Sequence, residues 1–220
     1  MRFSVLAIAA LSVSMSCIAQ AGDTLAKVAQ TGKLTVSYRE SSIPFSYLNG
    51  PGKPIGLSVD ITQAVINAVK QKTGKRDLEV EWMPVTTQNR MQLVLNGTLD
   101  LECGSTVNNS ARGKDVDFSV NFFYTGTRLL VKKSSGIKNY ADLAGKKVSS
   151  TTGATNYLVV RKYSAEKNLA IDFVLAKDHA DGFLLVESDR VAAFTLDDIL
   201  LYGLKANAKN PADYEVVGDA

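Results

Sequence analysis

Residues 146–176, KKVSSTTGATNYLVVRKYSAEKNLAIDFVLA, carry the pattern that decides the fold. The segments 146–150 and 171–176 predict β-strands, and the longer segment 155–167 between them predicts a helix. A strand, a helix and a second strand in this order form the unit from which parallel sheets are built. This stretch therefore predicts an α/β architecture.

The same alternation continues on both sides of this unit. After it, we expect helices at 178–188 and 196–206 and strands at 191–195 and 214–218. Before it, we expect a short helix ending before Gly32, helices at 60–72 and 88–95, strands at 34–38, 78–85 and 99–103, and a β-rich segment at 123–131. The pattern predicts two α/β lobes, 22–125 and 126–220, with parallel sheets covered by helices on both faces.

The N-terminus has the features of an export signal. Arg2 precedes the apolar segment 5–13, and Ala19-Gln-Ala21 matches a cleavage site, so we expect residues 1–21 to be a signal peptide. The alternative, a lipoprotein acylated at Cys17, is disfavoured by the residues before that cysteine. No later apolar stretch is long enough to cross a bilayer. We therefore expect a soluble periplasmic protein.

The composition limits the classes of partner. Of the 220 residues 45% are hydrophobic, which is enough for one large domain or two small ones with real cores. The formal net charge is only +3 and no basic run stands out, which argues against binding nucleic acid through bulk electrostatics.

Polar loops follow most of the predicted strands. Parallel sheets bind ligands at the carboxyl ends of their strands, so these loops are the candidate site. They are residues 39–47, 86–90, 103–112, 149–155, 177–181 and 195–198.

The sequence offers no convincing catalytic or metal-binding set. It has neither a G-x-S-x-G nucleophile motif nor a phosphate-binding P-loop. His179, the single histidine, and Cys103 make too few ligands for a zinc site. A catalytic Cys103–His179 pair is the less favoured interpretation, so we expect no enzyme activity, no metal and no cofactor.

The loops do contain the groups that recognise an amino acid. Arg112 offers a forked pair of donors for a carboxylate, and Ser105 can add a hydrogen bond. Thr155 opens a predicted helix, whose free N–H groups favour an anion. Asp197 or Asp198 could hold an ammonium group. Together these groups fit the head of an α-amino acid.

Arg39, Arg90 and His179 add further positive or hydrogen-bonding groups to these loops. If they face the same cleft, a second carboxylate on the ligand would balance them. Alternatively, the two arginines are ordinary surface residues.

These residues also carry a resemblance to a known family. The chain resembles periplasmic solute-binding proteins of ABC importers for polar amino acids, most of all those for glutamate and aspartate. The segments that carry the resemblance are RESSIPFSY (39–47), TTQNRMQLVLNGTLDLECGSTVNNSAR (86–112), DFS (117–119), GTRLLVKK (126–133), ADLAGKKV (141–148), AKDHADG (176–182) and DD (197–198).

The resemblance implies a type II periplasmic-binding-protein fold, in which two α/β lobes joined by crossing strands close on the ligand. It implies that the α-groups of the amino acid are held by Arg112, Ser105, Thr155 and Asp197. It implies that the side-chain carboxylate is addressed by Arg39, Thr87, Arg90 and His179. It also implies a monomeric receptor that delivers its ligand to a membrane permease and its ATPase.

The chain departs from the family pattern at several positions. Val107 stands where close relatives tend to have a threonine, so only its backbone N–H can donate to a ligand. Ala154 replaces a hydroxyl residue beside Thr155, and Ala180 and Gly182 alter the segment after His179. The preference between glutamate and aspartate is therefore not predicted.

Relatives continue beyond the point that corresponds to Ala220, back into the first lobe, and place there a second cysteine that would pair with Cys103. We therefore expect that this sequence is truncated and its first lobe incomplete. We also expect the 220-residue product alone to be unstable or unable to bind ligand.

Two other functions stay open. An enzyme on the same fold, such as a cyclic-acid dehydratase, would need an acid–base pair such as Glu102 with His179. A ligand-sensing module would need a separate signalling partner.

Overall fold

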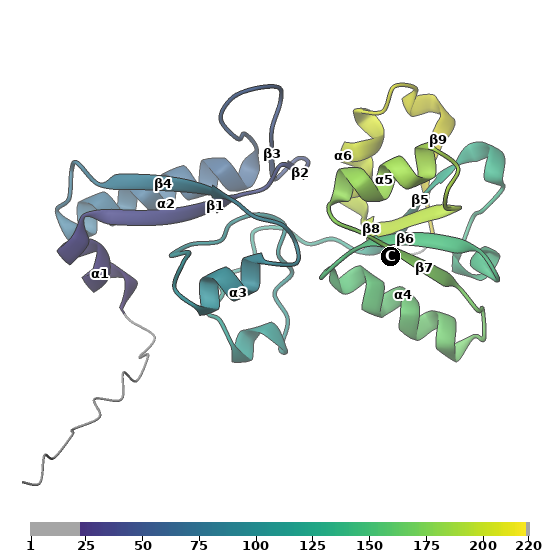
Figure 1. The fold of residues 1–220 in the computed structure, drawn as a ribbon, viewed down its shortest axis with the longest axis horizontal. Coiled ribbons are helices and arrows are strands. Elements are labelled where there is room, and N and C mark those ends of the chain that lie inside the picture. The colour runs from purple at the N-terminus through teal and green to yellow at the C-terminus, as the bar shows by residue number, and fades with distance from the viewer. Residues whose placement is uncertain (1–22, 219–220) are drawn as a thin grey trace, which may run out of the picture.

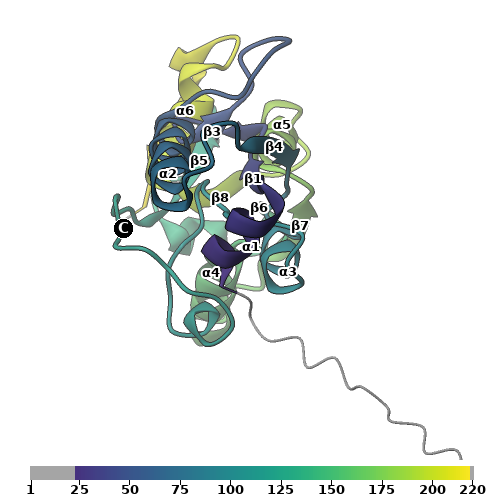
Figure 2. The same cartoon turned by 90° about the vertical axis from the view of Figure 1, so that its left-hand side faces the viewer.

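The computed structural model describes residues 23–218, which form two α/β lobes side by side (Figure 1). We call the elements from α1 to η1 lobe 1 and those from β5 to β9 lobe 2. Figure 2 looks along the long axis, with lobe 1 in front of lobe 2. The predicted signal peptide lies outside the described residues, and the predicted lobe boundary at 125/126 stays a prediction.

Lobe 1 is built on two parallel strands. Its elements are α1 (Thr24–Thr31), β1 (Lys33–Tyr38), β2 (Ser41–Ser42), β3 (Ser46–Tyr47), α2 (Leu57–Thr73), β4 (Glu79–Pro84), α3 (Arg90–Leu95) and the 3-10 turn η1 (Arg112–Lys114). β1 pairs with β4, and β2 pairs with β3 in an antiparallel hairpin. Val28, Leu34, Val36, Ile66 and Leu78 form the buried core between α1, α2 and the β1–β4 pair.

The strand predicted at 99–103 is wrong, because this segment makes only one bridge, between Leu101 and Val36. Polar side chains here bind backbone N–H groups that would otherwise extend the hydrogen-bond ladder with β1. The carboxylate of Asp100 accepts from the Thr35 N–H at 2.9 Å, and the Cys103 N–H donates to the Ser37 hydroxyl at 3.3 Å. The segment therefore follows β1 without becoming a full strand.

Lobe 2 contains a five-stranded sheet with the strand order β7-β6-β8-β5-β9. Its elements are β5 (Thr127–Lys132), η2 (Lys133–Ser135), η3 (Tyr140–Leu143), β6 (Lys147–Thr151), α4 (Thr155–Glu166), β7 (Asp172–Ala176), α5 (His179–Glu187), β8 (Ala193–Asp197), α6 (Asp198–Ala206), η4 (Pro211–Asp213) and β9 (Tyr214–Val217). The strand–helix–strand unit predicted at 146–176 is confirmed as β6, α4 and β7.

The expectation of a wholly parallel sheet is wrong for lobe 2. β7, β6 and β8 are parallel, but β5 is antiparallel to both β8 and β9. β5 enters directly from lobe 1 instead of through a crossover helix, so it is not bound to the direction of the βαβ units.

Helices cover both faces of the lobe 2 sheet, with α4 on one side and α5 and α6 on the other (Figure 1). Val160 of α4 packs on Val148 and Leu129, while Phe183 of α5 and Leu201 of α6 share the opposite cluster. The carboxyl ends of β6 and β8 lead directly into the segments that face lobe 1. Among residues 23–218, no helix combines the length and apolar character needed to span a bilayer.

Candidate functional site

A small cavity, with a water-accessible volume of about 10 Å³, lies between the two lobes. All the site residues predicted from the sequence line it, except Arg39. The lining residues are Thr87, Arg90, Ser105, Val107, Arg112, Ala154, Thr155, Asn156, His179, Leu196, Asp197 and Leu200. Because the first five come from lobe 1 and the others from lobe 2, the cavity exists only where the lobes meet.

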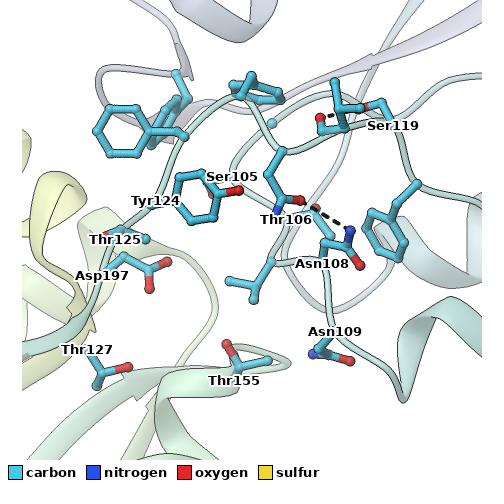
Figure 3. A pocket seen from close by; sticks show the side chains of 18 of the residues that line it. Ser105, Thr106, Asn108, Asn109, Ser119, Tyr124, Thr125, Thr127, Thr155 and Asp197 are labelled. Atoms are coloured by element: carbon cyan, nitrogen blue, oxygen red, sulfur yellow. Dashed lines mark hydrogen bonds between the residues drawn. The ribbon is translucent and has the colours of Figure 1, made fainter.

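A larger hollow, with a water-accessible volume of about 440 Å³, adjoins this cavity and shares Ser105, Val107, Thr155 and Asp197 with it. Figure 3 shows this hollow, with Asp197 and Thr155 on the lobe 2 side and Ser105 in the loop from lobe 1. Aromatic residues of the segment 118–124 also line the hollow. The small cavity, whose lining is mostly polar, therefore adjoins a larger hollow with aromatic residues in its lining.

Arg39 and Arg90 are buried despite their charge, with 0% and 3% of their surface exposed. Arg39 directly follows β1, and Arg90 begins α3. The Nη2 atom of Arg39 donates to Asp178 of lobe 2 at 2.9 Å. The Nε and Nη1 atoms of both arginines have no hydrogen-bond partner within the described part of the chain. Such unpaired buried donors are costly, so the pair is suited to an anion.

Burial lowers the pKa of Arg90 to about 10. The carboxylate of Glu102 opposes this shift, while the charges of Arg39 and Arg112 add to it. Arg90 therefore keeps its charge at neutral pH, next to two other arginines.

His179 begins α5 and is fully buried. Burial lowers its pKa to about 3; Arg39 and Arg90 also lower it, and Asp178 opposes them. Its Nδ1 lies 2.8 Å from the hydroxyl of Thr151, and its Nε2 has no partner among residues 23–218. A neutral imidazole that accepts from Thr151 carries its proton on Nε2, where it can donate to a carboxylate.

Thr87 adds one more unpartnered group, since its buried hydroxyl makes no hydrogen bond to the described residues. Thr87 and Arg90 come from the loop after β4, as the sequence predicted. Unpartnered polar groups thus line the cavity from Thr87 and Arg90 of lobe 1 and from His179 of lobe 2. Arg39 does not line the cavity, but it lies close enough to lower the pKa values of Arg90 and His179.

Arg112 lines the cavity from lobe 1 and reaches lobe 2. Its Nη1 donates to the carbonyl of Val107 at 2.9 Å, and its Nη2 donates across the lobes to the carbonyl of Gly153 at 3.2 Å. Burial lowers the pKa of Arg112, while Glu102 and Asp197 oppose the shift. Two of its five N–H groups are thus used, and the others can serve a ligand.

Asp197 and Asp198, which the sequence left as alternatives for an ammonium ion, have different surroundings. Asp197 ends β8, lines the cavity and accepts from Asn156 Nδ2 at 3.0 Å. Burial raises its pKa, against the effects of Asn156 and Arg90. Asp198 instead accepts from the Thr125 hydroxyl at 2.6 Å, in the segment that joins the lobes. Asp197 is therefore the acid at the cavity.

Ser105 and Thr155 lie on opposite sides of the cavity. The Ser105 hydroxyl contacts the Ser42 hydroxyl at 3.4 Å, and Thr155 is the first residue of α4. The free N–H groups at the start of α4 therefore lie beside the cavity, as expected for a helix N-terminus that favours an anion.

The structure also shows residues that the sequence analysis did not select. Asp178 pairs with Arg39, Thr151 orients His179, and Asn156 orients Asp197. Only Asp178 had a sequence signal of its own, because it is the first residue of the predicted helix 178–188. The others depend on contacts between distant segments.

Cys103 and Glu102, the partners of His179 in the alternative catalytic pairs, line neither the cavity nor the adjoining hollow. Cys103 is a free, half-buried thiol whose pKa is raised by burial, and it lines neither cavity. Glu102 affects the pKa values of Arg90 and Arg112, and its Oε2 accepts from Thr106. Residues 23–218 contain no group of three or more His, Cys, Asp or Glu side chains suited to a metal ion.

Comparisons with known proteins agree with this geometry. Residues 34–189 match the family of bacterial extracellular solute-binding proteins, family 3. The chain is 48% identical to an L-glutamate/L-aspartate-binding protein of Pseudomonas aeruginosa over 89% of this chain and 65% of the relative. It is 47% identical to a glutamate/aspartate import solute-binding protein of Salmonella typhimurium over 90% of this chain and 66% of the relative. It therefore spans slightly less than two thirds of these relatives.

Solved structures show the same fold. An arginine-binding protein of T. maritima superposes with a TM-score of 0.78 at 25% identity, covering 90% of this chain and 80% of the other. An ancestral arginine-binding protein bound to glutamine gives 0.75 at 26% identity, covering 86% and 79%. The predicted two-lobe type II fold is therefore confirmed. The chain belongs to the bacterial extracellular solute-binding proteins of family 3.

Proposed function

We propose that the protein is an extracytoplasmic receptor that captures glutamate or aspartate between its two lobes and delivers it to an ABC importer. Membership of the solute-binding family and the names of the similar relatives support this proposal. The receptor acts in the periplasm after its signal peptide is removed. It works as a monomer that hands its ligand to a membrane permease driven by an ATPase.

The observation that carries the proposal is the set of unpartnered buried donors. They are Nε and Nη1 of Arg39 and Arg90, the hydroxyl of Thr87 and Nε2 of His179. A side-chain carboxylate would bring acceptors to several of them at once. It would also balance the charge of two buried guanidinium groups, which a neutral amide could not do.

The α-groups of the amino acid take the other part of the cavity. Arg112, the backbone N–H of Val107 and the Ser105 hydroxyl bind the α-carboxylate, together with the start of α4 at Thr155. Asp197 binds the ammonium group. The support is that these groups line one cavity from both lobes, so a ligand that contacts all of them holds the lobes together.

The protonation state of His179 favours binding over catalysis. A buried histidine with a pKa of about 3 stays neutral near pH 7 and is a poor general acid or base there. In this proposal it serves as a neutral hydrogen-bond donor, and the protein is not an enzyme.

The test is a melting-temperature screen of the purified protein, as encoded by its natural gene, against the twenty amino acids. At about 100 times its dissociation constant a ligand stabilises the folded protein by about 2.7 kcal/mol. We expect stabilisation by glutamate and aspartate and much less by glutamine and asparagine. Equal stabilisation by the neutral amino acids would contradict the proposal.

A further inference from the structure

Asp178 joins the two lobes beside the cluster of unpartnered donors. It precedes α5, and its Oδ1 accepts from the His179 N–H at 2.6 Å as a helix N-cap. The same oxygen accepts from Arg39 Nη2 at 2.9 Å and from the Ser41 hydroxyl at 2.7 Å, both of lobe 1. The Ser41 oxygen in turn accepts from the Ala180 N–H at 3.4 Å. One carboxylate therefore fixes an arginine of lobe 1 against the helix start of lobe 2.

The position of Arg39 depends on this contact. Its guanidinium is fully buried, and Asp178 is the only side chain of residues 23–218 to which it forms a hydrogen bond or ion pair. Burial alone would raise the pKa of Asp178, but Arg39 and then His179 lower it below its usual value. Asp178 is therefore a charged partner, which restrains Nη2 and leaves Nε and Nη1 unpartnered.

A competing partner for Arg39 lies nearby. A Cβ built on Gly104 would lie 2.9 Å from Oε1 of Glu102 and 3.0 Å from Cγ of Arg39, so the two side chains flank the same glycine. Oε1 of Glu102 is buried and has no partner among the described residues. Without Asp178, the guanidinium of Arg39 would be free to turn toward Glu102 and would be lost to a ligand.

We infer that Asp178 is a positioning residue that sets the preference for an acidic over a neutral amino acid by holding Arg39 in place. This inference rests on the proposed function, because Arg39 is there one of the groups that meet the side-chain carboxylate. Two effects oppose each other when Asp178 is removed. The site gains net positive charge, which attracts an anion, but Arg39 loses its orientation and turns to Glu102. The second effect dominates because Oε1 of Glu102 has no partner among the described residues and flanks the same glycine as the Arg39 side chain.

The test compares two substitutions of Asp178 by calorimetric titration of the purified protein with glutamate and glutamine. Asp178→Ser keeps a good N-cap residue but is too short to reach Arg39. Asp178→Asn keeps a neutral acceptor within reach. Asp23→Ser is the matched control, because Asp23 caps α1 and lies far from the cavity.

We expect Asp178→Ser to weaken glutamate binding about 10- to 100-fold, which is the usual effect of removing a group that orients a binding residue. The affinity for glutamine should change by less than about twofold. Asp178→Asn should lower the affinity for glutamate by an intermediate factor, and Asp23→Ser should leave it unchanged. Equal weakening of both ligands would mean that Asp178 only holds the lobes together, and would overturn the inference. Unchanged glutamate binding would overturn it too.

A second measurement does not depend on the ligand. In the crystal structure of unliganded Asp178→Ser, the Arg39 guanidinium should leave its present position and approach Glu102. An unmoved Arg39 would overturn the inference even if the protein binds acidic amino acids. A wild-type protein that does not prefer acidic amino acids would instead refute the proposed function, while the position of Arg39 would still decide the role of Asp178.

Discussion

Gly203 offers a way to weaken lobe closure without touching the cavity. It lies in α6 of lobe 2 and faces Ile43 of lobe 1, and neither residue lines the cavity or the adjoining hollow. A Cβ at Gly203 would lie 2.6 Å from the carbonyl oxygen of Ile43 and 2.8 Å from its Cγ2. The closer atom belongs to the backbone, so Gly203→Ala cannot be accommodated by a side-chain rotation alone.

The substitution has two effects of opposite sign. An alanine inside a helix is favoured over glycine by about 1 kcal/mol, which stabilises lobe 2. Overpacking against lobe 1 costs about 1–3 kcal/mol, but only while the lobes are together. If ligand binding requires the lobes together, this cost appears in the binding equilibrium. The dissociation constant for glutamate should then rise roughly 5- to 150-fold.

The assay pairs urea unfolding of the unliganded protein with calorimetric titration of the same variant. Gly52→Ala is the matched control, because a Cβ at Gly52 would meet no heavy atom within 4 Å. The reasoning predicts that Gly203→Ala keeps or raises the urea midpoint while glutamate binding weakens, and that Gly52→Ala changes neither. Unchanged affinity in Gly203→Ala would refute the idea that the lobes must come together as they do here.

Three further predictions concern the charged groups of the cavity. Arg112→Ala should weaken binding of glutamate and glutamine alike by about 2–5 kcal/mol, because both share the α-carboxylate; calorimetry that finds binding intact would remove Arg112 from the anchor role. Arg39→Met and Arg90→Met should each lower the glutamate-to-glutamine affinity ratio by about tenfold or more while glutamine binding persists, and an unchanged ratio would contradict the side-chain assignment. For His179, the folded-state pKa of about 3 lies below the ordinary value of 6.5, so the unfolded chain takes up the proton first as the pH falls. The contribution of His179 to the free energy of unfolding is complete above pH 6.5. As the pH falls toward 3, this contribution is lost at up to about 1.4 kcal/mol per pH unit. His179→Gln should therefore flatten the fall of the urea midpoint between pH 7 and pH 5, and an equally steep fall in this variant would show that other groups cause it.

The sequence predicted the helices and strands best where whole βαβ units repeat. The unit β6–α4–β7 lies where 146–176 placed it, because its pattern needs no distant partner. The predictions that failed concern how strands pair. The segment 99–103 has the composition of a strand, but the side chains of Asp100 and Ser37 form hydrogen bonds with backbone N–H groups that a regular ladder would use. The direction of β5 depends on how the chain enters lobe 2, which periodicity does not encode.

The site was predictable to the extent that it follows the strand ends. The loops after β4, β6, β7 and β8 and the segment 105–112 meet between the lobes, so residues far apart in the sequence line one cavity. The sequence could not tell whether Asp197 or Asp198 lies at the cavity, because only the structure shows that Asp198 is bound by Thr125. Asp178 was missed because its role exists only where Arg39 of the other lobe reaches it. The ligand roles of the site residues stay predictions.

The central claim, that two buried arginines and a neutral histidine select an acidic side chain, is tested most directly by one calorimetric comparison. The purified protein is titrated with glutamate and with glutamine, which differ only in the charged or neutral end of the side chain. The account predicts glutamate binding at least about a hundredfold tighter, since a site with unpaired buried donors rejects a ligand that cannot satisfy them. Equal affinity for the two amino acids, or tighter binding of glutamine, would contradict it.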